Sequence, residues 1–354
     1  MANTRVIGLD IGTSAVRAAE LEFGAGGPQG KNPPTLVRFG EVPVPLGAVR
    51  DGEVVQPESV ANALRQLWSQ AKFESKDVVL GVGNQRVLVR ELEVPWMPVA
   101  QIKESLPYQV GEMLPMAVDD ALLDFYPTGE VDSPSGRLAR GMLVAAQRDT
   151  VTANVLAVEA AGLHPQMVDL NGFALMRALA RGDLANATAA FVDIGATITT
   201  VVVASRGVPR LVRTLPSGGQ HVTNALATAR SISGPEAEAM KREIGIGFAV
   251  TPDRQDAADA VAHIARALVE SIRNTFVYYA GNNPGAGIDV VVLSGGGSHL
   301  PGLGQYLSSA SRLPVTLADP LAGLRTAKTA RRDQLTGRES CVALPIGLAY
   351  GVAA

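Results

Sequence analysis

The sequence predicts an α/β fold with two domains, and three short strings carry this prediction. Residues 8–14 (Gly-Leu-Asp-Ile-Gly-Thr-Ser) and 192–197 (Val-Asp-Ile-Gly-Ala-Thr) each place an aspartate at the end of an apolar run, before a glycine and a hydroxyl residue. The apolar run 290–293 likewise enters the glycine-rich residues 294–298. Buried strands that end in glycine turns are typical of α/β proteins. A chain of 354 residues is long enough for two domains with separate cores.

The residue types in these strings suit phosphate and magnesium. A glycine in such a turn lets backbone N–H groups face a phosphate, a hydroxyl adds a donor, and a carboxylate orders a hydrated Mg²⁺. We therefore expect Asp10 and Asp193 to hold Mg²⁺ through water. The remaining candidates around a phosphorylated ligand are Gly12, Thr13, Ser14, Gly195, Ala196, Thr197, Gly295, Gly296 and Gly297. One such turn alone would more often be an ordinary strand-to-helix connection, but two turns and a glycine run indicate a nucleotide site.

Composition excludes several other functions. Hydrophobic residues make up 47% of the chain, charged residues 18%, and the net charge is only −3, so nothing indicates a nucleic-acid binder. The single cysteine, Cys341, excludes an internal disulfide. Four scattered histidines offer no zinc spacing. We expect no metal site beyond the Mg²⁺ held by carboxylates.

The two ends of the chain predict a cytoplasmic protein without direct membrane insertion. Residues 1–5 lack the basic, apolar and small-residue pattern of a signal peptide. The most apolar segment near an end, residues 342–354, is too short to span a bilayer and contains Pro345. We interpret it as a closing helix that packs on the first domain.

The elements after the first string follow a recognisable order. Residues 17–21 continue as a strand, and the Gly/Pro-rich residues 24–35 read as an exposed loop. Residues 57–72 have Pro57 at the start and a stripe of apolar side chains, which predicts a helix. Residues 78–82 read as a buried strand. This is the βββαβ order of a ribonuclease-H-like domain.

Residues 80–147 depart from that order. We expect a strand over 86–94, a break at the prolines of 95–98, and a helix over 101–113. Two further strands, 119–128 and 138–146, are expected to be joined by the polar loop 129–137. This segment is too large for a loop, so it predicts an inserted α+β subdomain.

Together these strings resemble the actin-like ATPase superfamily, which includes FtsA, MreB, heat-shock chaperones and sugar kinases. The resemblance implies two ribonuclease-H-like domains around a cleft that binds ATP and Mg²⁺. Glu238, Lys241 and Arg242 lie at i, i+3 and i+4 on one predicted helix face. In the chaperone and MreB branches such a Glu and Lys pair frames the ribose and adenine.

The implied domains are discontinuous in the chain. The first comprises residues 1–79, 148–186 and 344–354, and 80–147 is the inserted subdomain. Residues 187–232 and 286–343 form the second domain, and 233–285 form its helical, adenine-side subdomain.

The insertion resembles that of the PilM family of type IV pilus assembly proteins more closely than that of FtsA. The strings that carry this resemblance are residues 93–97, 123–126, 142–146, 169–175 and 344–349, together with Gly218, Gly219 and Thr223. Gly219 thereby joins the expected ATP ligands. The resemblance covers nearly the whole chain and leaves mainly the loops 24–35 and 325–340 unmatched.

This family resemblance implies an ATP-binding scaffold that is peripheral to the inner membrane. The partner would be the cytoplasmic N-terminal tail of a PilN-like bitopic protein of the pilus assembly complex, bound as an extended peptide in a groove of the inserted subdomain. Trp96 and Met97, set between two prolines, are the candidates least suited to a core. The full set of apolar candidates is Leu88, Leu92, Val94, Trp96, Met97, Ile102 and Leu106, and each could instead belong to the subdomain's own core.

Hydrolysis of the nucleotide stays open at this point. Gln147 ends a predicted strand, where actin also carries a glutamine, and it is the candidate to hold the attacking water. Asn224 stands where FtsA typically has aspartate, which leaves slow hydrolysis or none. Two alternatives also stay open: an FtsA-like filament protein that self-associates, and a sugar or small-molecule kinase.

Overall fold

The first domain is built on a six-stranded sheet in the order β10-β6-β1-β2-β3-β16. The computed structural model describes residues 4–30, 32–134, 136–330 and 332–351, so residues 1–3 and 352–354 of the expected first domain lie outside it. Strands β1 to β3 are antiparallel, and β6 and β10 extend the sheet in parallel to β1. The strands are β1 (Thr4–Ile11), β2 (Ala15–Phe23), β3 (Thr35–Pro43), β6 (Asp77–Val82), β10 (His164–Leu170) and β16 (Arg325–Thr326).

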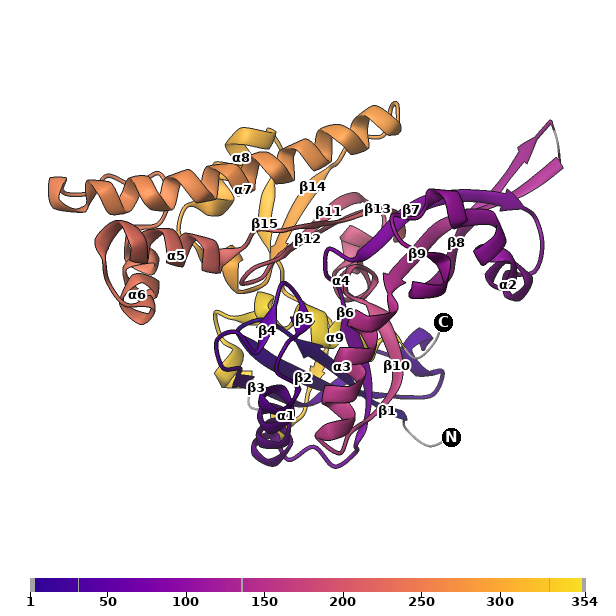
Figure 1. Cartoon of the computed structure of the whole chain (residues 1–354), viewed down its shortest axis with the longest axis horizontal. Helices are drawn as coiled ribbons and strands as arrows, with labels where there is room; N and C mark the ends of the chain where they lie inside the picture. The colour runs from indigo at the N-terminus through magenta and orange to yellow at the C-terminus, as the bar shows by residue number, and fades with distance from the viewer. Residues whose placement is uncertain (1–3, 31, 135, 331, 352–354) are drawn as a thin grey trace.

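The second domain repeats this plan on a five-stranded sheet in the order β13-β12-β11-β14-β15. Its β11–β12 hairpin and the parallel β14 correspond to β1, β2 and β6 of the first sheet. The α/β fold with two similar domains is therefore confirmed (Figure 1). The strands are β11 (Thr188–Ile194), β12 (Thr199–Ser205), β13 (Val208–Leu215), β14 (Val290–Ser294) and β15 (Val315–Leu317).

Helices cover the outer face of each sheet. On the first sheet, α1 (Pro57–Ala71) and α3 (Arg148–Ala160) bury apolar side chains such as Leu64 and Ala157 against β1, β2 and β6. On the second sheet, the long helix α7 lies across the strands with the other helices beside it (Figure 1). These helices are α5 (Gly219–Arg230), α6 (Gly234–Ile244), α7 (Gln255–Asn282) and α8 (Leu303–Ser311).

Two short helices fill the space between the sheets. Helices α4 (Asn171–Leu179) and α9 (Ala343–Ala349) belong to a core that also contains side chains of both sheets, such as Leu21 and Phe191. They cross at close range, because a Cβ atom on Gly347 would overlap the carbonyl oxygen of Ala174. The segment predicted as a closing helix thus packs on the first sheet as expected, and it contacts the rest of this shared core as well.

Short elements complete the two domains. A small hairpin, β4 (Val49–Arg50) and β5 (Glu53–Val54), extends from the first domain. The 3₁₀ turns are η1 (Gly27–Gln29), η2 (Gly111–Met113), η3 (Val118–Asp120), η4 (Gly182–Ala185), η5 (Pro252–Arg254), η6 (Gly296–His299), η7 (Lys328–Ala330), η8 (Arg332–Leu335) and η9 (Glu339–Val342). No helix in the described part of the chain is both long and apolar enough to span a membrane.

The inserted subdomain has a three-stranded sheet, β7-β9-β8, with helix α2 against it. The predicted polar loop 129–137 is wrong: β8 continues to Ser133, which pairs with Gly136 at the start of β9. The ends of these two strands form a ribbon that extends away from the rest of the subdomain (Figure 1). Most residues of 129–137 are polar, glycine or proline, so their composition resembles that of a loop. The elements are β7 (Val87–Pro95), α2 (Val99–Val110), β8 (Ala121–Ser133) and β9 (Gly136–Gln147).

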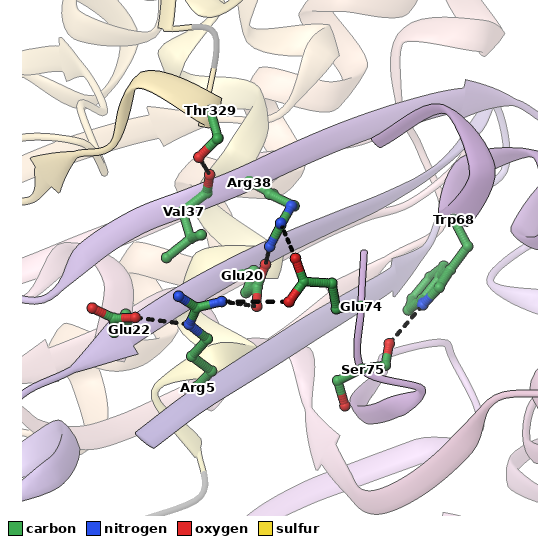
Figure 2. A network of polar contacts seen from close by, with 9 residues as sticks. All are labelled: Arg5, Glu20, Glu22, Val37, Arg38, Trp68, Glu74, Ser75 and Thr329. Carbon is green, nitrogen blue, oxygen red and sulfur yellow. Dashed lines mark hydrogen bonds and ion pairs between the residues drawn. The ribbon is translucent and has the colours of Figure 1, made fainter. Parts of the chain in front are cut away.

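Two expected domain boundaries differ from the structure. The division between residues 79 and 80 falls inside β6, which runs to Val82 in the first sheet. Residues 325–330 were expected in the second domain, but β16 pairs with β3 and Thr329 donates a hydrogen bond to the Val37 carbonyl at 2.6 Å (Figure 2). This segment has little apolar periodicity of its own, so only its pairing partner identifies where it docks.

A network of charges lies on the first sheet (Figure 2). Glu20, only 1% exposed, accepts a hydrogen bond from Arg38 at 2.7 Å, and Arg38 also contacts Glu74 at 2.5 Å. Arg5 pairs with Glu22 at 2.7 Å on the neighbouring strand. A buried carboxylate is costly unless it is paired, and Arg38, together with Arg5 at 3.8 Å, provides this pairing for Glu20. The network also fixes the loop after α1 to β3.

Gly347→Ala tests the close helix crossing. The added methyl group meets backbone rather than a flexible side chain, so α4 and α9 must separate. We expect a loss of about 2 kcal/mol or more in the free energy of unfolding, measured by urea denaturation. Gly287→Ala is the control, because a Cβ there has no atom within 4 Å. Equal stability of the two variants would contradict this account of the crossing.

Candidate functional site

The two predicted turns have the same backbone geometry. The Gly12 N–H donates to the Ala15 carbonyl at 3.0 Å, and the Gly195 N–H donates to the Ile198 carbonyl at 2.9 Å. A Cβ atom on Gly12 would lie 2.9 Å from the Ala15 carbonyl oxygen, and one on Gly195 would lie 2.9 Å from that of Ile198. Both turns therefore require glycine. We call the first turn, residues 10–15, hairpin 1 and the second, residues 193–198, hairpin 2.

The two hairpins face each other across the domains. The hydroxyl oxygens of Thr13 and Thr197, 184 residues apart in the chain, lie 3.1 Å from each other in a hydrogen bond. Each hydroxyl belongs to the turn of a strand hairpin, so the two turns meet at this point. Their role as phosphate ligands stays a prediction.

The two aspartates of the hairpins are short of positive charge. The pKa of Asp10 is raised to about 6, mainly by burial; Arg17 opposes the shift, and the charges of Asp193 and Glu41 add to it. Burial also raises the pKa of Asp193, against a hydrogen bond that its Oδ1 accepts from Ser294 at 2.8 Å. Two buried carboxylates, of which one raises the pKa of the other, form an arrangement that a divalent cation stabilises. The donor set therefore fits Mg²⁺ bound directly or through water.

Arg17 is a site residue that the sequence reasoning missed. It lies opposite Asp10 in the β1–β2 pairing, and its Nη1 is 3.8 Å from Asp10 Oδ2. Its Nε donates to Glu41 Oε2 at 2.6 Å. The sequence offered a way to find Arg17. A two-residue turn in an antiparallel hairpin sets the register of the two strands and therefore identifies the residue opposite Asp10.

Glycines let two further backbone segments, 218–220 and 295–297, pack against hairpin 2. The N–H groups of Gly219 and Gln220 donate to the carbonyls of Gly195 and Ala196, at 2.9 and 2.7 Å. Gly295 has a φ of +80°, and a Cβ there would lie 2.5 Å from the Ile194 carbonyl oxygen. Side chains at Gly218 and Gly297 would also overlap hairpin 2. These glycines have structural reasons in addition to any contact with a ligand.

Gly296 differs from its neighbours. A Cβ atom built on it has no atom within 4 Å, although Gly295 and Gly297 on either side are tightly packed. Of the three glycines in this run, it is therefore the one whose surface is open to a ligand. It begins η6, directly after the buried strand β14.

The predicted helix face of α6 joins the same cluster. Lys241 Nζ donates to the Gly219 carbonyl at 3.2 Å and to Thr223 Oγ1 at 2.9 Å, and it pairs with Glu238 at 2.5 Å. Burial opposes ionisation of Glu238, but hydrogen bonds from Lys241 and Thr223 outweigh it and lower the pKa. Arg242 also contacts Glu238, at 3.1 Å, and is largely exposed. Charged side chains of α6 thus lie beside Gly219, with Lys241 in direct contact with its carbonyl.

Gln147 and Asn224 are the two residues that the sequence analysis connected with hydrolysis. Gln147 ends β9 opposite Ala121, and its backbone N–H donates to the Arg86 carbonyl. These contacts lie within the inserted subdomain, so a role beside the phosphates stays a prediction. Asn224 accepts a hydrogen bond from Gln220 at 2.9 Å on the surface of α5.

The apolar candidates of the inserted subdomain divide into two groups. Leu92, Val94, Ile102 and Leu106 are all at most 8% exposed and form the core between β7, β9 and α2. For these four, the alternative interpretation as core residues describes the structure, because the small sheet needs them to hold α2. Leu88 and Met97 are partly buried. Only Trp96, 49% exposed, presents a large apolar surface.

Trp96 is held in place by neighbours on the β8–β9 ribbon. Its Nε1 donates to Glu130 Oε1 at 2.9 Å, and the Arg137 guanidinium lies 5.3 Å from the ring centroid. Its backbone N–H donates to the Arg137 carbonyl at 3.0 Å. The exposed side chains of Val99, Tyr108 and Met113 on α2 and η2 add apolar surface that the sequence reasoning did not single out.

Comparison with known proteins agrees with this geometry. The family model for the type IV pilus assembly protein PilM matches residues 8–351. A solved PilM-PilN type IV pilus biogenesis complex is similar with a TM-score of 0.84 and 26% identity, over 99% of this chain and 98% of that chain.

More distant relatives share the fold. MreB5 of Spiroplasma citri bound to ADP gives a TM-score of 0.51 at 15% identity, over 97% of this chain and 94% of that one. EutJ from Carboxydothermus hydrogenoformans gives 0.54 at 17% identity, over 99% and 90%. Cell division protein FtsA of Bacillus subtilis is 23% identical over 269 residues, which span 70% of this chain but only 59% of FtsA.

The fold with its paired hairpins is therefore that of the actin-like proteins, and the inserted subdomain belongs to the same architecture as that of the PilM-PilN complex. The family match extends over nearly the whole described chain, from hairpin 1 through the inserted subdomain to α9. The chain belongs to the PilM family of type IV pilus assembly proteins.

Proposed function

We propose that this chain is a nucleotide-binding scaffold of type IV pilus assembly, which binds the cytoplasmic N-terminal tail of a PilN-like bitopic inner-membrane protein. The observation that carries the proposal is the similarity to the PilM-PilN complex over 99% of the chain, which includes the inserted subdomain. Its place would be the cytoplasm, peripheral to the inner membrane through that partner.

The hairpins support binding of Mg-ATP. Thr13 and Thr197 would exchange their mutual hydrogen bond for phosphate oxygens, because a hydroxyl donates equally well to either. Asp10 and Asp193 would hold the hydrated Mg²⁺, which supplies the positive charge that these carboxylates lack. The adenosine would lie against Gly296, with Gly219, Lys241 and Glu238 along its side. We propose binding, and not turnover, as the function of this site.

The inserted subdomain supports peptide binding. Its sheet has two edge strands, β7 and β8, and an extended peptide gains backbone hydrogen bonds when it adds to such an edge. Trp96 directly follows β7 and presents half of its surface, oriented by Glu130 and Arg137. A large aromatic side chain that is already held in place loses little entropy on binding, so Trp96 is the proposed anchor.

Asp10→Asn separates stability from nucleotide binding. Removal of the charge should weaken the affinity for Mg-ATP at least tenfold, measured by calorimetry. The nucleotide-free protein should become more stable at pH 7.5, by up to about 3 kcal/mol, because its Asp10 has a folded pKa near 6 and an ordinary value of 3.8. Below about pH 4 the Asp10 carboxyl is protonated in both the folded and the unfolded state and costs no stability. As the pH rises through 6, the free energy of unfolding falls, because the unfolded chain releases this proton more readily than the folded one.

The gain from Asp10→Asn should accordingly shrink when unfolding is measured at pH 4.5. Asp183→Asn, on an exposed turn, is the control and should change neither property. An Asp10→Asn variant that binds Mg-ATP like the wild type would contradict the assignment of Asp10.

Gly296→Val tests the adenosine end of the site. The space around Gly296 accepts a side chain in the nucleotide-free protein, so the melting temperature should stay nearly unchanged. Nucleotide affinity should fall below detection, because the valine occupies the surface proposed for the ribose and adenine. Gly297→Val is the matched comparison and should unfold the protein, since its side chain would overlap Ile194. If Gly296→Val unfolds the protein too, Gly296 is a structural turn residue.

Trp96→Ser tests the partner surface. A synthetic peptide with the N-terminal tail sequence of the partner should bind the wild type with micromolar affinity, as expected for a peptide of about ten residues. The variant should lose at least tenfold in affinity, measured by fluorescence anisotropy, while Mg-ATP affinity is retained. Tyr278→Ser on α7, 56% exposed, is the matched control. Undiminished peptide binding by Trp96→Ser would place the partner elsewhere.

A further inference from the structure

Arg338 connects the two ends of the proposed nucleotide site. Its Nη2 lies 2.9 Å from Oε1 of Glu41 on β3, and Oε2 of the same carboxylate is 2.6 Å from Nε of Arg17. Two residues further on, the Ser340 carbonyl accepts a hydrogen bond from the Gly295 N–H at 3.0 Å. The Ser340 hydroxyl is 2.8 Å from Nε2 of His299, at the end of η6. The segment 338–340 therefore contacts both the phosphate side and the adenosine side.

The geometry of Glu41 determines what Arg17 can do. Each carboxylate oxygen of Glu41 serves one guanidinium group, so Arg17 is bound through Nε alone and its Nη1 is directed at hairpin 1, 3.8 Å from Asp10. A carboxylate without a second partner prefers to bind an arginine through both oxygens. Loss of the Arg338 contact would therefore free Oε1 for Arg17 and draw the guanidinium away from the hairpins.

Arg17 matters because its guanidinium stands beside hairpin 1, which meets hairpin 2 through the hydrogen bond between Thr13 and Thr197. Its charge therefore lies next to the region where the two hairpins meet. Burial would raise the pKa of Glu41, but Arg17 and Arg338 lower it, so Glu41 stays ionised and can hold both arginines. The balance of charge around a bound polyphosphate would therefore depend on the position of the Arg17 guanidinium.

We propose that Arg338 is a positioning residue of the nucleotide site, which acts through Glu41 to keep the Arg17 guanidinium directed at the hairpins. The proposal rests on the nucleotide binding proposed above and adds a residue from the second half of the chain to it. Because the segment of Arg338 is hydrogen-bonded to Gly295 and His299, the position of Arg17 is linked to the loop that would hold the adenosine. The backbone of residues 338–340 thus links the phosphate side of the proposed site to its adenosine side.

The test is a double-mutant cycle read by calorimetry with Mg-ATP and with Mg-ADP. Arg338→Gln should weaken both affinities about fivefold, and Arg17→Gln should weaken them at least as much. In the Arg17→Gln background, Arg338→Gln should have no further effect, because Arg338 acts only through Arg17. Arg338→Lys should restore most of the affinity, since an ammonium group still occupies Oε1 of Glu41.

Arg5→Gln is the matched control. Arg5 also pairs with a glutamate across neighbouring strands of the first sheet, at 2.7 Å, but at the other end of these strands (Figure 2). Its loss should leave nucleotide affinity unchanged. Thermal unfolding of all variants then shows how much stability is lost when an Arg–Glu pair is removed. Unchanged affinity of Arg338→Gln, tighter binding by it, or additive losses in the double variant would each overturn the proposal. A wild-type chain that binds no nucleotide would refute the proposed function and this inference together.

Discussion

The close crossing of α9 with α4 is the constraint on which the rest of the structure depends. Both helices lie between the two sheets, and Gly347 lets the α9 backbone approach that of α4 more closely than any side chain would allow. Gly8 in β1 performs the same role for α9, because a Cβ there would overlap the Pro345 carbonyl. The spacing of β1, α9 and α4 is thereby set by backbone contacts, which cannot adjust as flexible side chains do.

The site follows from this spacing. Since β1 and β11 both end near the shared layer of helices, hairpins 1 and 2 come within hydrogen-bonding distance at Thr13 and Thr197. The same approach places Asp10 and Asp193 close enough for the charge of one to affect the pKa of the other. Arg17, shared with Glu41, and the hydrogen bond from Ser294 to Asp193 offset this unfavourable arrangement of charge.

The inserted subdomain has a core cluster of its own and also contributes to the shared core. Its own cluster contains buried side chains of β7, β8, β9 and α2, while Met142 of β9 belongs to the core between the two sheets. Trp96, 49% exposed, lies outside both. Any communication between partner and nucleotide would have to pass through elements that both regions share. Helix α3, which follows directly from β9 and packs on the first sheet, is such an element.

The sequence by itself determined the local features of this protein: the two Asp-Gly hairpins, the glycine run after β14, the Glu238 and Lys241 face of α6, and the presence of an inserted subdomain. These are predictable because strand alternation, glycine turns and helical spacing are short-range properties. Tertiary structure decided the rest. It placed Leu92, Val94, Ile102 and Leu106 in a core rather than a groove, extended β8 to Ser133 and β9 back to Gly136, and paired β16 with β3 of the first sheet. It also brought Arg338 to Glu41, 297 residues away in the chain. Such outcomes depend on which surfaces meet in three dimensions, and a one-dimensional pattern of apolar and polar residues does not specify the partner of each surface.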